Sequence, residues 1–150
     1  LAQQGTHDEA LVQYQKCLDI ETRVVGHEHP DVAMSYNNIG NVLRKQGDYE
    51  NALLQHKKAL EVFVAVYGHE HPDVANSYNG IGNVLDSQGD YENALFHHQK
   101  ALEIRTRVYG QDHLDVAKSY NGIGNVLQSQ GEYEEALVDW SALAQRVQTQ

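Results

Sequence analysis

The sequence is poor in residues that would cross-link the chain, anchor it in a membrane or give it positive charge. Its single cysteine, Cys17, excludes a disulfide within the chain, so a reducing, cytoplasmic compartment is the simpler expectation. No apolar run reaches the roughly 20 residues that a membrane-spanning helix requires, and we expect no membrane partner. Lys and Arg number 11 against 21 Asp and Glu, a formal net charge of −10. Nucleic acids bind through clustered cations, so they are not expected as partners either.

Catalytic motifs are absent as well. The sequence contains no P-loop, no GxSxG nucleophile turn and no HExxH zinc motif. Cys17 lacks the sequence context of a cysteine nucleophile. We therefore expect neither an enzyme nor a bound cofactor.

What the sequence does have is a repeat of 42 residues. The string GDYENAL occurs twice, with close variants GTHDEAL before it and GEYEEAL after it. The string SYNNIGNVL is likewise followed by two copies of SYNGIGNVL. Between residues 26–67 and 68–109, 11 of 42 positions differ. A fixed period of this size indicates a solenoid, in which each unit buries its apolar side only against its neighbours.

Each unit is predicted to form two helices. The first begins near Pro30, Pro72 or Leu114, because proline suits the first helical position. It ends at a glycine of the 42-residue period, and the second helix begins at the next residue. The prediction is a single repeat domain over 1–150, all-α, with about seven helices. It comprises a partial unit 1–25 and the units 26–67, 68–109 and 110–150, the last with its second helix starting at Glu132.

These repeats resemble tetratricopeptide repeats of the long, kinesin light chain-like type. The residues that carry the resemblance are Tyr36, Ile39 and Gly40 in the first helix, the turn glycine Gly47, and Tyr49 and Ala52 after it, each with its copies. The pattern's next aromatic place holds Tyr14, His56, His98 and Trp140, and its last small place holds Cys17, Ala59, Ala101 and Leu143. The resemblance implies a right-handed α-solenoid of stacked antiparallel helix pairs that acts as a protein-interaction scaffold.

The resemblance also implies where a peptide or protein segment would bind. Asparagines four apart share one face of each first helix, and in this family that face lines a concave groove. An asparagine side chain both donates and accepts hydrogen bonds, as a peptide backbone requires. The candidate groove residues are Asn37, Asn41, Asn79, Asn83, Asn121 and Asn125, with Arg44, Lys45 and Lys118 as the basic residues near them. The competing interpretation is that these amides are solvated or bond to one another between repeats.

The histidines support simpler interpretations. His56 and His98 occupy an aromatic packing place, and we expect them to pack there. The loops before the first helices hold His27, His29, His69, His71 and His113. One loop offers at most two imidazoles, whereas tetrahedral zinc takes three or four ligands. We therefore expect a hinge between repeats and no metal site.

Two alternatives stay open, beside a third in which the histidine loops make the chain a metal-responsive module. The segment is either a peptide-binding scaffold or a structural spacer without its own ligand, with end-to-end self-association as a property of its stacked repeats. The second full unit also differs from the third in one string, since Phe63, Val64 and Ala65 stand where Arg105, Thr106 and Arg107 follow later. We expect this string on the outer side of its helix, either as a contact with another domain or chain or as a difference without function.

Overall fold

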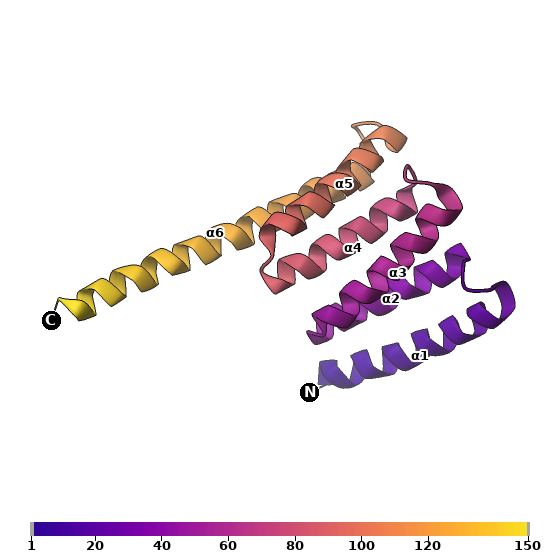
Figure 1. The fold of residues 1–150 in the computed structure, drawn as a ribbon, viewed down its shortest axis with the longest axis horizontal. Helices are drawn as coiled ribbons and strands as arrows, with labels where there is room; N and C mark the ends of the chain where they lie inside the picture. Colours follow the sequence, from indigo (N-terminus) through magenta and orange to yellow (C-terminus); the bar gives the residue numbers. More distant parts are fainter. Residues whose placement is uncertain (1, 150) are drawn as a thin grey trace.

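The computed structural model describes residues 2–149, except for the side chains of Ala2 and Leu143. The predicted place of Leu143 in the packing therefore lies outside the described part. Six helices follow one another along the chain, and Figure 1 shows them stacked side by side. They are α1 (Ala2–Val25), α2 (Pro30–Gln46), α3 (Tyr49–Tyr67), α4 (Pro72–Gln88), α5 (Tyr91–Tyr109) and α6 (Leu114–Gln148). The predicted all-α fold of antiparallel helix pairs is confirmed.

The first helices α2 and α4 end at the glycines that the period indicates. Gly47 and Gly89 take left-handed φ angles of 85° and 81°, which glycine adopts without steric cost. The N–H of Gly47 bonds the carbonyl of Arg44 at 3.0 Å, and the next N–H, of Asp48, bonds that of Leu43 at 2.9 Å. This pair of backbone hydrogen bonds is a Schellman cap, which satisfies two carbonyl groups at the end of the helix. The Asp48 side chain then caps α3.

Stacking buries an apolar interior between successive helices. Each second helix, α3 or α5, contacts the first helix before it and the first helix after it. The small residues Ala59, Ala75 and Ala101 are fully buried and let the helices approach closely, while Phe63 fills the space between them. The first helices also contact one another, α2 with α4 and α4 with α6.

The prediction of about seven helices is wrong, because the last two predicted helices are one. α6 runs through Gly131, which unlike Gly47 and Gly89 does not take a positive φ. Figure 1 shows its C-terminal half projecting beyond the other helices. The cap residue differs at this place, because Asp48 and Asp90 accept from the N–H three residues later, whereas Glu132 stands at the equivalent position. The second half of α6 continues straight, and Trp140 is 70% exposed.

No helix within residues 2–149 combines the length and apolar character needed to cross a membrane.

Candidate functional site

A cleft of about 350 Å³ lies across the first helices α2 and α4. It contains five of the nine predicted groove residues, namely Asn37, Asn41, Asn79, Asn83 and Lys118. Residues that sequence reasoning did not select also line it, among them Asn38, Asp73, Phe63 and Arg105. The structure therefore brings the asparagines of two repeats to one surface, together with an aromatic and a basic side chain from the second helices.

The inner asparagine of each repeat is held by a buried histidine. Asn37 Oδ1 lies 2.9 Å from His56 Nδ1, and Asn37 also donates from Nδ2 to the hydroxyl of Ser77 at 3.1 Å. Asn79 Oδ1 lies 3.0 Å from His98 Nδ1 in the next repeat. Since the asparagine oxygen accepts from Nδ1–H, the Nε2 atoms remain unprotonated and have no hydrogen-bond partner in the described part of the chain. Asn37 and Asn79 are thus partly committed to the fold, through histidine and serine side chains and not through one another.

The two imidazoles are enclosed by glycines from neighbouring repeats. A methyl group added at Gly40 would lie 2.7 Å from His56 Nε2, and one added at Gly80 would lie 2.5 Å from the same ring. Gly82 and Gly122 enclose His98 in the same way. Burial lowers the pKa of both rings to about 4, with positive charge on Arg44 and Arg105 adding to the effect. His56 and His98 are therefore neutral packing residues at pH 7, and their predicted packing place is confirmed.

The outer asparagines differ from the inner ones. Asn41 is exposed and Asn83 is half-buried, both at the cleft. Among residues 2–149, no side chain forms a hydrogen bond with the amide of either one. These two amides can therefore accept from and donate to a molecule that enters the cleft.

Arg105 stands at a repeat position that holds a chemically different residue in each repeat. The equivalent residues are Glu21 in α1 and Phe63 in α3. Glu21 and Arg105 each form a hydrogen bond with a serine of the following first helix. Arg105 donates to Ser119 at 2.8 Å and to Asn76 Oδ1 at 2.9 Å. Phe63 and Arg105 are both buried, so the expectation that this string lies on the outer side is wrong for these two residues. The side chain points inward because its partners lie on the neighbouring first helices.

The guanidinium of Arg105 has only neutral hydrogen-bond partners. Burial lowers its pKa, and the charge of Asp115 opposes that shift. Within the described residues, no carboxylate comes close enough to pair with it. An unpaired buried cation at the edge of a cleft favours an anionic group in a ligand.

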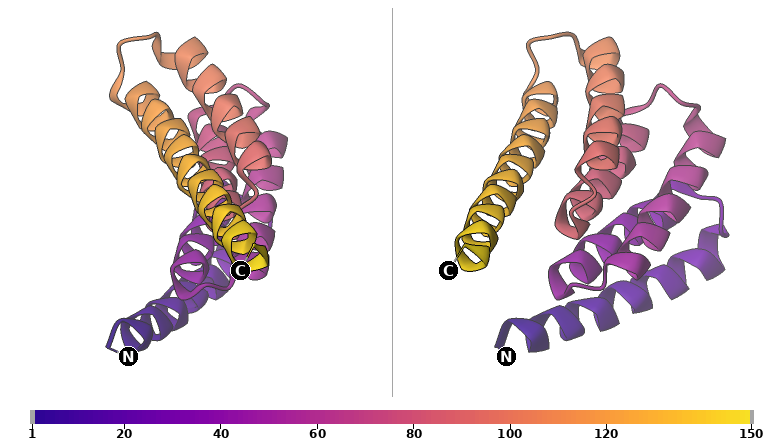
Figure 2. Two further views of the ribbon diagram at one scale, coloured as in Figure 1. Left: turned by 90° about the vertical axis from the view of Figure 1, so that its left-hand side faces the viewer. Right: turned by 60° about the vertical axis from the view of Figure 1, so that its left-hand side comes forward.

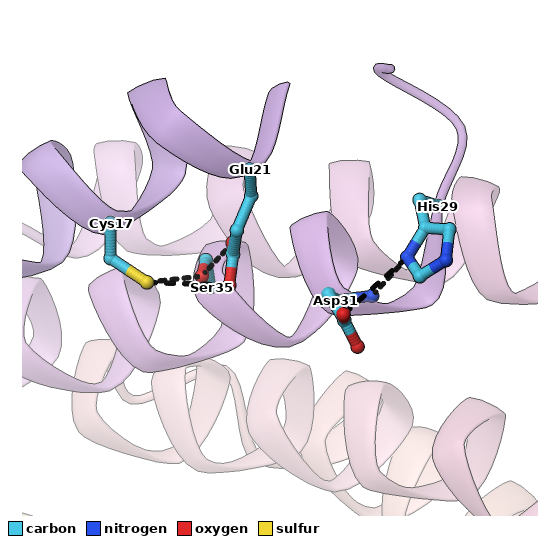
Figure 3. Close-up of polar contacts among 5 residues, drawn as sticks. All are labelled: Cys17, Glu21, His29, Asp31 and Ser35. Carbon is cyan, nitrogen blue, oxygen red and sulfur yellow. Dashed lines mark hydrogen bonds and ion pairs between the residues drawn. The ribbon is translucent and has the colours of Figure 1, made fainter. Parts of the chain in front are cut away.

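In the first repeat the same position forms a small polar cluster, drawn in Figure 3. Glu21 accepts from the Ser35 hydroxyl at 2.6 Å and from the Cys17 thiol at 3.3 Å. The hydrogen bond to Glu21 raises the pKa of the Cys17 thiol, and the hydrogen bond to Ser35 works against it. A raised thiol pKa disfavours the thiolate, so this cluster lacks an activated nucleophile.

The loop histidines cap the first helices. Nδ1 of His29, His71 and His113 accepts the backbone N–H two residues later, at 3.0 to 3.1 Å. Figure 3 shows this for His29 and Asp31. Two of these rings also stack on a tyrosine, His71 on Tyr67 and His113 on Tyr109. The signal in the sequence was the histidine placed directly before the helix start in every copy.

Within residues 2–149, no three His, Cys, Asp or Glu side chains are grouped as a metal site would require.

Four predicted groove residues lie outside the cleft lining. Asn121 and Asn125 are exposed on α6, and Lys45 is exposed near the end of α2. Arg44 is half-buried, and its charge partly offsets the rise that burial causes in the pKa of Asp86. The cleft thus unites the asparagines of α2 and α4 but not those of α6.

Comparison with known proteins agrees with this geometry. The tetratricopeptide repeat family model matches residues 1–63, 31–106 and 81–138. Among solved structures, BtubC (BKLC) from P. vanneervenii is similar with a TM-score of 0.75 and 28% identity, over 97% of this chain and 59% of that one. A Podospora anserina protein described as a kinesin light chain with nearly identical TPR-like repeats is similar with a TM-score of 0.73 and 18% identity, over 89% and 64% of the two chains.

The chain spans less than two thirds of the length of either structure. No curated protein matches the sequence significantly. The repeats, the caps and the matches along most of the chain lead to one conclusion. The chain belongs to the tetratricopeptide repeat family, whose members generally serve as protein-interaction modules.

Proposed function

We propose that this chain captures an extended peptide segment of a partner protein in the cleft across α2 and α4. The observation that carries the proposal is the pair of outer asparagines. Asn41 and Asn83 stand at equivalent positions of adjacent repeats, both at the cleft and both without a hydrogen bond to their side-chain amides within the described residues. A primary amide pairs with a peptide group through one donor and one acceptor. Two such amides on adjacent helices suit successive parts of one extended backbone.

The inner asparagines have a supporting role in this proposal. Asn37 and Asn79 are fixed by His56 and His98, so the surface from which the outer amides project is rigid. A rigid surface loses little conformational entropy on binding. The cleft volume of about 350 Å³ lies within the usual range of ligand pockets.

The charges of the cleft indicate the kind of peptide. Arg105 and Lys118 line it together with a single carboxylate, Asp73, in a protein whose formal net charge is −10. The Arg105 guanidinium has no carboxylate partner within the described residues. A carboxylate on the peptide would supply that partner through charge-assisted hydrogen bonds. We therefore favour a segment that carries at least one acidic side chain.

An immobilised-peptide array tests the proposal, with sequences that vary in acidic content. The double variant Asn41→Ala/Asn83→Ala removes the outer amides without touching the histidine contacts. With a net contribution of about 0.5–1.5 kcal/mol from each of the two side chains, binding should weaken roughly 5- to 150-fold. Asn125→Ala is the matched control, an exposed asparagine at the same repeat position outside the cleft. Equal signals from the wild type and the double variant would contradict the proposal.

A further inference from the structure

The first helices α2, α4 and α6 carry a buried serine at one equivalent position. Ser35, Ser77 and Ser119 are at most 3% exposed. A buried hydroxyl without a hydrogen bond costs free energy, so each serine needs a partner. All three have one among the described residues, but the partner differs from repeat to repeat.

Two of these serines are bonded by a charged residue of the second helix before them. Ser35 donates to Glu21 at 2.6 Å, as Figure 3 shows, and Ser119 accepts from Arg105 Nη1 at 2.8 Å. Glu21 and Arg105 stand at equivalent positions of α1 and α5. Both views of Figure 2 show α5 beside α6, the helix that carries Ser119. A charged side chain at this position therefore holds the serine of the following first helix.

The third serine is bonded by an asparagine instead. Phe63 stands at the equivalent position of α3 and has no polar atom in its side chain. Ser77 is bonded by the inner asparagine of the preceding first helix, with Asn37 Nδ2 at 3.1 Å from its hydroxyl oxygen. The Asn37 oxygen contacts His56 Nδ1 at 2.9 Å. Both ends of the Asn37 amide are thus held by the fold.

Asn79, the inner asparagine of the next repeat, is held at one end only. Its oxygen lies 3.0 Å from His98 Nδ1, but its nitrogen has no hydrogen-bond partner within residues 2–149, and Ser119 is already bonded by Arg105. A proton on His98 Nε2 would be a buried donor without an acceptor among the described residues, so the proton lies on Nδ1 and the Asn79 oxygen accepts it. The free end of this amide is therefore its Nδ2 group, and Asn79 lines the cleft.

Arg105 also fixes the amide of Asn76. Its Nη2 donates to Asn76 Oδ1 at 2.9 Å, so the amide nitrogen is left for another partner. Asn76 is exposed at the cleft, and its Nδ2 has no partner in the described part of the chain. Met34 holds the equivalent place in the preceding repeat and offers no amide. The part of the cleft around Arg105 thus has two amide nitrogens available as donors, those of Asn76 and Asn79.

We infer that Arg105 is a positioning residue that makes Asn79 the third peptide-binding asparagine of the cleft, beside Asn41 and Asn83. By holding Ser119, it leaves the Asn79 Nδ2 group free to donate to a backbone carbonyl of the captured segment. The inference rests on the proposed function, since it assigns a further contact to the same peptide.

Side-chain amide exchange, measured by nuclear magnetic resonance, tests the role of Arg105 without a ligand. In the wild type the Asn79 Nδ2 protons should exchange with water at least about tenfold faster than those of Asn37, whose nitrogen is bonded. Asn38 is exposed and provides the rate of an unbonded amide in the same protein.

Two changes separate a positioning role from a merely structural one. Arg105→Met removes the donors but keeps a long side chain, so Ser119 becomes available and the exchange of Asn79 should slow to the rate of Asn37. Adding Ser119→Ala should restore the fast exchange, although it removes one more polar group. A loss of packing alone gives no such recovery. Arg105→Leu repeats the experiment if the first variant misfolds, which circular dichroism checks.

Ser77→Ala is the matched change in the preceding repeat. It removes the partner of Asn37 Nδ2, so the exchange of Asn37 should rise to the rate of Asn79. Equal rates for Asn37 and Asn79 in the wild type would overturn the inference. So would an Asn79 rate that Arg105→Met leaves unchanged.

The affinity for the acidic array peptide that binds most tightly tests the ligand contact. Ser77→Ala should raise this affinity roughly 2- to 12-fold, because it frees a further amide at the cleft. Arg105→Met should lower it, and adding Ser119→Ala should raise it again by roughly 2- to 12-fold. Affinities that neither serine change alters would overturn the assignment of Asn79 as a ligand contact. A protein that binds no array peptide would contradict the proposed function, while the exchange rates would still decide the role of Arg105.

Discussion

The buried ring of His56 and the side chain of Asn37 are joined by a contact of 2.9 Å between Nδ1 and Oδ1, and His98 and Asn79 repeat it at 3.0 Å. The contact links a second helix to the first helix of its own repeat. Burial of the ring, rather than the contact itself, favours the neutral imidazole, since a protonated ring would be charged in a buried site. Several properties of the solenoid follow from this arrangement.

Stability should fall in mild acid. Both rings have a pKa of about 4 in the folded protein, below the ordinary value of 6.5. The unfolded chain therefore takes up protons first, and stability present above pH 6.5 is lost as the pH falls towards 4. The loss should approach about 3 kcal/mol per ring. Urea unfolding at pH 7 and pH 4.5 measures it.

His27→Gln is the control for this measurement, because it removes an exposed histidine and leaves both buried rings in place. The same acid sensitivity is expected in the control. A free energy of unfolding that is constant between pH 7 and pH 4.5 would show that the rings are not kept neutral by the fold.

Replacing glycine by alanine should have opposite effects on stability at two equivalent positions, Gly82 and Gly124. At Gly82 it would lie 2.7 Å from the ring of His98, so Gly82→Ala should destabilise the fold by about 1–3 kcal/mol. At Gly124 it would meet nothing, and Gly124→Ala should stabilise α6 by up to about 1 kcal/mol through helix propensity. Thermal melts at low protein concentration compare the two. Shifts of the same sign would mean that the glycine–imidazole contact does not govern the packing.

The histidine caps should contribute measurably to stability at neutral pH. His29→Ala removes the acceptor for the N–H of Asp31 and should cost about 1 kcal/mol, whereas His29→Asn keeps an acceptor and should cost less. His71→Ala removes a cap and also the stacking on Tyr67, where the ring centroids are 3.8 Å apart. It should therefore cost about 0.5–1.5 kcal/mol more than His29→Ala. Denaturant titrations measure all three, and equal costs at both sites would contradict the role of the stack.

Charge reversal at the cleft should weaken binding of an acidic peptide. Lys118→Glu places a like charge beside the ligand, and affinity should fall about tenfold, mainly through a slower association rate. Lys45→Glu is the matched control, an exposed lysine outside the cleft lining with the same change in net charge. The comparison is made by surface binding kinetics at low and high salt. Equal losses in both variants would assign the effect to overall charge rather than to the cleft.

The sequence predicted most helix ends, because the signals there are local. Pro30 and Pro72 start the first helices, and Gly47 and Gly89 end them, as their neighbours in the chain indicate. Gly131 shows how small the deciding local difference is. The string GEYEEAL that begins there is almost the same as GDYENAL at Gly89, yet the helix continues. Asp90 and Asn93 form the cap of α5, whereas Glu132 and Glu135 stand at the equivalent positions.

The sequence predicted which residue type lines the candidate site. It did not predict which asparagines are held by the fold and which are available to a ligand. The period placed the asparagines of α2 and α4 on one face, and the cleft contains them. Nothing local distinguishes Asn37, which a histidine 19 residues away holds, from Asn41, whose side chain is unoccupied within the described residues. The prediction that the string at this position lies on the outer side is wrong for Arg105. Its partners Ser119 and Asn76 lie 14 and 29 residues away in the sequence, so no local pattern indicates these contacts. Contacts of this kind appear only once the helices are stacked.

The position shared by Phe63 and Arg105 has a consequence for how near-identical repeats find their places during folding. α3 and α5 resemble each other so closely that one could pack in the other's place, a known failure of repeat proteins. Arg105 in the place of Phe63 would meet Ser77, which already bonds Asn37, and Phe63 in the place of Arg105 would leave Ser119 and Asn76 without its guanidinium. The first exchange buries the guanidinium away from its partners, and the second leaves the buried Ser119 hydroxyl without its donor unless the Asn79 amide leaves the cleft to replace it. Each unsatisfied buried group costs about 1–3 kcal/mol. One variable position thus opposes the mispairing that the shared positions of α3 and α5 would otherwise permit.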